Sequence, residues 1–168
     1  MRLTLELVDF SNKSAKNPDN KAGDKTVSFL QKTFAIATKI CGKDMSSLGL
    51  HPAVYVYSHA TGKHQPSAFM AVAKWIQELE ASNLLAQFCA IRKDFEDFLI
   101  KNESVSREIV SIRGSRNRAV PTLVNYYQFL LNRFLDALSS DEVMKKLEED
   151  SGLKGFVASA RRGRGLSN

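Results

Sequence analysis

Three histidines, His51, His59 and His64, are the side chains best suited to proton transfer or metal binding near neutral pH, and all lie in one segment. A metal site would need carboxylates or thiolates at close spacing beside them. No acidic residue occupies positions 45–77. The pattern therefore predicts solvated or locally bonded loop histidines, with no metal and no cofactor. General acid–base work by His59 or His64 stays open, although the sequence offers neither a partner.

The loop RGSRNR, residues 113–118, is the second candidate for chemistry. Its arginines and small polar residues directly precede a predicted helix, so guanidinium and backbone N–H groups could bind a phosphate there. It lacks the Gly-x-x-x-x-Gly-Lys-Ser/Thr spacing of a nucleotide-binding loop. The alternative is a solvated connection whose arginines pair with acids on neighbouring helices, such as Asp94, Glu96 or Asp97.

Positive charge is concentrated in this loop and at the end of the chain. The formal net charge is +6, and removing seven cations from these two segments leaves the rest at −1. Local basic patches of this kind bind polyanions, because phosphate neutralisation releases counterions. The sequence predicts DNA contact, without base reading, through these seven residues: Arg113, Arg116, Arg118, Lys154, Arg161, Arg162 and Arg164.

Apolar residues recur at three- and four-residue steps over most of the chain, which predicts amphipathic helices. The expected helices cover residues 26–40, 69–79, 84–99, 105–112 and 121–138. A capping box, Ser139 with Glu142, begins a last short helix. Trp75 is expected beside the buried face of the second helix. The prediction is a mainly α fold, a single-domain bundle of five or six helices with a short extended segment near residues 52–58.

Composition and the positions of turn-forming residues predict three parts in the chain. Residues 1–24 form a strand-like segment and polar loop, residues 25–150 the helical domain, and residues 151–168, with four glycines and no acid after residue 150, a basic flexible tail or linker. No apolar run approaches the roughly 20 residues that span a bilayer. Cys41 and Cys89 lie in apolar helical patterns, which predicts reduced, buried thiols in a cytoplasmic protein.

Three stretches resemble one bacterial family, the GmrSD-type modification-dependent restriction endonucleases and their uncharacterised relatives. They are the run SLGLHPAVYVYS…GKHQPSAFMAV (residues 47–72), the segment FEDFLIKN (95–102) and the ending GFVASARRGRGLSN (155–168). The resemblance covers roughly residues 25–168 and is specific mainly at residues 47–70. In that family a ParB-like domain with an Asp-Gly-Gln-type motif precedes a helical region, and many members end in a His-Asn-His nuclease domain with paired Cys-x-x-Cys ligands.

This chain contains none of those three motifs, so no catalytic residue of the family can be assigned to it. The resemblance implies a non-catalytic helical domain of a restriction or phage-defence protein. Its expected partners are DNA and the ParB-like and nuclease domains of the same or a partner chain, with no membrane contact. Two alternatives stay open. One is a protein-interaction module using a face with Tyr55, Tyr57 and Trp75, and the other is a small autonomous nuclease using the loop histidines.

Overall fold

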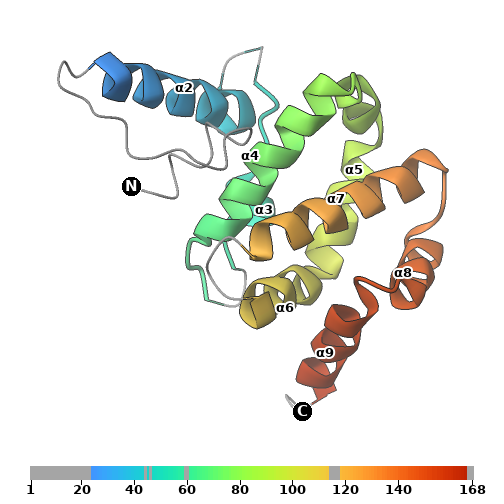
Figure 1. Cartoon of the computed structure of the whole chain (residues 1–168). Coiled ribbons are helices and arrows are strands. Elements are labelled where there is room, and N and C mark those ends of the chain that lie inside the picture. The colour runs from blue at the N-terminus through green and yellow to red at the C-terminus, as the bar shows by residue number, and fades with distance from the viewer. Residues whose placement is uncertain (1–23, 44, 46, 59–60, 114–117, 166–168) are drawn as a thin grey trace. The chain divides into compact units, whose positions relative to one another are not determined.

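The computed structural model describes residues 24–43, 45, 47–58, 61–113 and 118–165 (Figure 1). Within this part of the chain there are eight α-helices and no strand, which confirms the predicted mainly α fold. The helix count exceeds the predicted five or six because α3 (Pro52–Tyr55) and α9 (Lys154–Gly165) were not expected. The chain divides into two compact units, residues 1–52 and residues 53–168.

The smaller unit contains one long helix, α2 (Asp24–Cys41), close to the predicted range. The segment after it returns to the helix end, where Leu48 N–H donates to the Lys39 carbonyl at 2.7 Å and Leu50 N–H to the Ile40 carbonyl at 2.8 Å. These bonds satisfy carbonyls that a helix C-terminus otherwise leaves unpaired. The predicted strand-like segment, residues 1–24, lies outside the described residues except for its last position.

The larger unit is a helical bundle in which α7 packs against α4, α5 and α6, and α9 packs against α6 and α8 (Figure 1). Its helices are α4 (Pro66–Ala81), α5 (Leu85–Lys101), α6 (Glu103–Arg113), α7 (Ala119–Leu135), α8 (Ser140–Glu149) and α9 (Lys154–Gly165). Four of the predicted helices therefore exist at nearly the expected positions, and each contributes buried apolar residues to the core.

Trp75 lies at the centre of this core, not at its edge as predicted, and its side chain is fully buried. Its ring stacks on Phe95 with 5.2 Å between ring centroids. It meets Phe88 edge-on at 5.0 Å, and the tilted ring of Tyr127 at 5.4 Å. The indole Nε1–H donates to Gln128 Oε1 at 3.3 Å. Both the ring and its one polar group are satisfied, as a buried tryptophan requires.

The predicted extended segment near residues 52–58 is mostly helical, which corrects that expectation. Pro52 begins the single turn α3, and the Tyr55 hydroxyl at its end donates to Glu96 Oε1 on α5 at 3.1 Å. Only Tyr57 makes a β-type contact, an isolated antiparallel bridge with His64. Gly62 turns the chain between them with a φ of +64°, a conformation that glycine adopts without strain. The alternating Val and Tyr residues of this segment thus belong to a turn and not to a strand. Burial, together with the negative charge of Glu96, raises the pKa of Tyr55.

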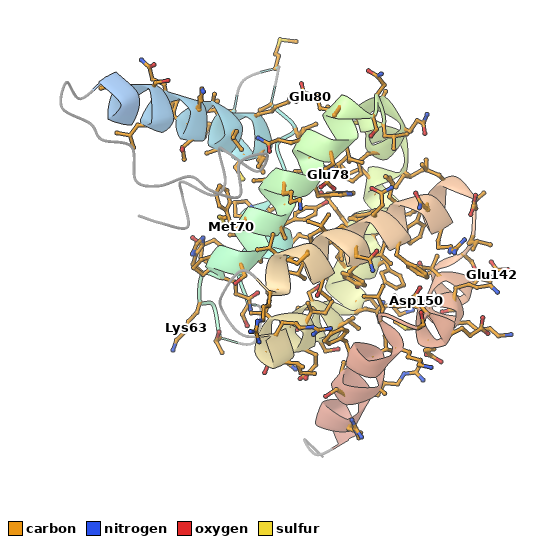
Figure 2. The ribbon with its side chains drawn as sticks, viewed as in Figure 1. Lys63, Met70, Glu78, Glu80, Glu142 and Asp150 are labelled. Atoms are coloured by element: carbon orange, nitrogen blue, oxygen red, sulfur yellow. The ribbon has the colours of Figure 1, made fainter. Side chains whose placement is uncertain are left out.

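The capping box predicted at the start of α8 is present. Ser139 Oγ accepts the Glu142 N–H at 3.4 Å, and Glu142 Oε2 accepts the Ser139 N–H at 2.9 Å. The Ser139 hydroxyl and backbone N–H both donate to the Glu142 carboxylate and hold its pKa below the ordinary value. Figure 2 shows Glu142 on α8 and Asp150 just beyond its end.

Replacing Ser139 with Ala should lower the free energy of unfolding by about 1 kcal/mol, because an N-cap side chain is lost. The Glu142 pKa is lower in the folded state, so the carboxylate stabilises the fold at neutral pH and this contribution disappears as the pH falls through the folded pKa. The difference between wild type and variant should therefore shrink in acid. Urea unfolding followed by Trp75 fluorescence at several pH values measures it. Ser140→Ala, one position inside the helix, is the matched control, and equal losses from the two variants would contradict the capping account.

The basic end of the chain forms α9, in contrast to the flexible tail predicted for residues 151–168. Asp150 Oδ1 accepts the N–H groups of Gly152 at 2.9 Å and Leu153 at 3.0 Å, which fixes the turn into the helix. Residues spaced three and four apart are then buried against the bundle: Leu153, Phe156, Val157 and Ala160. This apolar spacing, more than intrinsic helix propensity, explains why residues 154–165 are helical.

Candidate nucleic-acid interface

Arg113, at the end of α6, lies against the first turn of α9. Its guanidinium carbon is 5.4 Å from the centroid of the Phe156 ring, within the range of a cation–π contact. The same helix pair is joined further along by Ser159, whose hydroxyl donates to Glu108 Oε2 at 3.1 Å. Because residue 113 meets 156 while residue 108 meets 159, the two helices run antiparallel. Arg113 and Lys154 therefore lie at the same end of the α6–α9 pair.

Lys154 and Arg162 are both exposed on α9. Eight residues at 1.5 Å each separate them by roughly 12 Å along the helix, and they are about 80° apart around its axis. Arg118 is exposed directly before α7. Among the described residues, none of these three nor Arg113 forms an ion pair with a carboxylate. For Arg113 and Arg118, the two loop arginines that the structure describes, the predicted pairing with Asp94, Glu96 or Asp97 is not seen. Glu96 pairs with Arg92 and Asp97 with Lys93 instead.

Arg161 is the exception among the described members of the predicted set, because its guanidinium pairs with the Glu148 carboxylate of α8. It also lines a hollow of about 230 Å³ between α6, α8 and α9, together with Asn102, Val105, Met144 and Val157. Sequence reasoning missed this hollow, and no spacing in the sequence indicates it. Arg116 and the side chain of Arg164 lie outside the part of the chain that the structure describes.

The seven predicted cations therefore do not gather in one patch, as far as the described ones show. Arg113 and Lys154 lie at one end of the α6–α9 pair, and Arg161 and Arg162 lie toward the other. The three described cations of α9 itself, Lys154, Arg161 and Arg162, are spread along its length. An elongated distribution of this kind suits a linear polyanion better than a single phosphate group.

The histidines form no catalytic arrangement in the described residues. His64 is exposed and meets the Tyr57 ring edge-on, with 5.6 Å between ring centroids. His51 belongs to the smaller unit, and His59 lies outside the described residues. A search of the described residues finds no group of three or more His, Cys, Asp or Glu side chains that could hold a metal ion. Cys41 and Cys89 are exposed, so the prediction of buried thiols is wrong.

The predicted protein-interaction face does not form. Trp75 is fully buried and Tyr55 is 3% exposed, whereas Tyr57 is 43% exposed. Tyr55 ends the helical turn α3, whereas Tyr57 forms the bridge with His64. Their spacing of two residues therefore does not place the two side chains on one surface, as it would in a strand. The aromatic residues in question are therefore core and loop residues.

No family model matches the sequence, and neither a curated protein nor a solved structure matches it. The resemblance to GmrSD-type proteins accordingly stays a prediction. Among the described helices, none has the length and apolar character needed to cross a membrane.

Proposed function

We propose that this chain is a non-catalytic helical domain that contacts DNA through α9, the end of α6 and the start of α7. The observation on which the proposal depends is that four of the predicted cations, all exposed, have no carboxylate partner among the described residues: Arg113, Arg118, Lys154 and Arg162. Surface lysines and arginines on most folds lie among acids of similar number. Here two of the four cations, Lys154 and Arg162, lie on α9, and Arg113 contacts its first turn. Binding a phosphate requires only such exposed charges.

Two features make α9 a suitable element for this role. Its apolar side is fixed to the bundle by Phe156, Val157 and Ala160, so its cations project from a positioned helix. The contact between Arg113 and Phe156 orients one guanidinium, which reduces the entropy that a phosphate contact would cost. The contacts proposed are to phosphates, so they would confer affinity and not sequence preference.

The resemblance at residues 47–70 supports a wider context for the same activity. In that context the chain is the helical domain of a restriction or phage-defence protein. ParB-like and nuclease domains, in the same chain or a partner chain, would then supply the catalytic steps, and this domain would supply contacts to DNA and to those domains.

Binding of the wild-type chain to a fluorescein-labelled 25-base-pair duplex, followed by anisotropy between about 50 and 200 mM salt, tests the proposal. If four phosphates are contacted, log K should fall with log salt with a slope of about −3.6. A duplex of unrelated sequence should bind equally well, because phosphate contacts do not read bases. Absence of binding at the lowest salt would refute the proposal.

A further inference from the structure

Arg161 differs from the other described cations of the predicted DNA-binding set because it has a carboxylate partner within the protein. Its guanidinium pairs with Glu148 on α8, and the two side chains are 59% and 34% exposed. An ion pair this exposed contributes about 0–1 kcal/mol to stability, and less as salt increases. Glu148 therefore occupies a cation of the proposed DNA-binding surface, although the ion pair adds little to the stability of the fold.

A phosphate group can replace the Glu148 carboxylate at this guanidinium. Carboxylates and phosphates accept the same paired N–H groups of arginine, so the geometry that binds one also binds the other. Open volume beside the guanidinium exists, because Arg161 lines the 230 Å³ hollow between α6, α8 and α9. α9 is also held without this pair, by buried Phe156 and Val157 and by the Ser159–Glu108 hydrogen bond. Exchange of the partner thus requires no unfolding of the helix.

We propose that Glu148 is an intramolecular competitor that binds Arg161 in the free protein and is displaced by a DNA phosphate. This inference rests on the proposed function. Once displaced, the Glu148 carboxylate stays near the incoming phosphate and repels it. Glu148 therefore lowers the affinity of the surface, because its ion pair with Arg161 must break before the phosphate contact forms.

The test is Glu148→Gln, which keeps the size of the side chain and removes its charge. With Arg161 free, the variant should bind the 25-base-pair duplex about 3- to 10-fold more tightly at about 50 mM salt, while the slope of log K against log salt stays the same, because Arg161 contacts a phosphate in both complexes. Thermal unfolding should shift by no more than about 4 °C. If Gln at this position disturbs α8, Glu148→Ala makes the same charge change with a better helix former.

Glu149→Gln is the matched control, because it makes the same charge change on the same helix. The Glu149 carboxylate lies 3.3 Å from Lys146 within α8 and makes no described contact with α9. This variant should leave the salt slope unchanged and tighten binding less than Glu148→Gln. The double variant Glu148→Gln, Arg161→Gln should lose the gain.

Equal effects of the Glu148 and Glu149 variants would overturn the inference while leaving the proposed function intact, since only net charge would then matter. Failure of the wild-type chain and of every variant to bind at low salt would instead refute the proposed function, and this inference with it.

Discussion

Replacing Arg113, Arg118, Lys154 and Arg162 together with glutamine should weaken binding to duplex DNA by about 100-fold or more at about 50 mM salt. Each phosphate contact contributes about 0.9 to the salt slope, so the slope should fall by about 3 to 4. The four side chains are exposed, and their removal should leave the fold in place apart from the Arg113–Phe156 contact, which contributes about 0.5–1 kcal/mol. Anisotropy titrations at several salt concentrations give both quantities.

The control for this variant changes the net charge by the same amount on other surfaces. It replaces four lysines that lie outside α6, α7 and α9 with glutamine: Lys63, Lys93, Lys101 and Lys145. Figure 2 shows Lys63 on the opposite side of the view from α8. The control should keep the wild-type salt slope, because diffuse charge alters long-range attraction but not the number of phosphates contacted. Equal weakening by both variants would show that α9 is no specific interface.

Replacing Trp75 with Ala should lower the free energy of unfolding by about 3–5 kcal/mol. The indole is fully buried in contact with Phe88, Phe95 and Tyr127, which come from two other helices. Its removal leaves a cavity lined by these three rings, which close packing of the core cannot fill without moving them. Gln128 also loses its buried donor. Against a typical total stability of about 5–15 kcal/mol, the variant should be partly unfolded in moderate urea.

Urea unfolding followed by far-UV circular dichroism measures this loss, because the chain has one tryptophan and the variant removes it. Trp75→Phe, which keeps an aromatic ring beside Phe95, should cost clearly less than the alanine variant. A loss below about 1 kcal/mol for Trp75→Ala would contradict the placement of this residue at the centre of the core.

The helices of the larger unit could be predicted because their apolar residues repeat with the period of a helix. Positions such as Phe88, Phe95 and Leu99 are buried as that spacing indicates. The depth of individual side chains could not be predicted, because it depends on which helices meet. Trp75 is central only because α5 and α7 bring Phe95 and Tyr127 into contact with it and with each other. Ile112 continues the apolar stripe of α6 and yet is 55% exposed.

The candidate interface could be predicted as a list of charges but not as an arrangement. Local positive charge is visible in the sequence, whereas the partner of each cation is not. The pairing of Arg161 with Glu148 needs the turn between α8 and α9, and the contact of Arg113 with Phe156 joins residues 43 positions apart. The helix α9 could not be predicted either, because the four glycines of residues 151–168 have low helix propensity. The apolar spacing of Leu153, Phe156 and Val157 is a weaker signal in the sequence.

Those glycines have a consequence for the motions of the domain. A side chain at Gly155 or Gly163 would meet nothing within 4 Å, and neither residue has a positive φ, so packing and backbone geometry do not require glycine there. Each still costs about 0.5–1 kcal/mol of helix stability relative to alanine. α9 can therefore open locally at a lower free energy than the helices around Trp75, while the rest of the bundle stays folded. A polyanion bound to the proposed DNA-binding helix would lower the frequency of this opening.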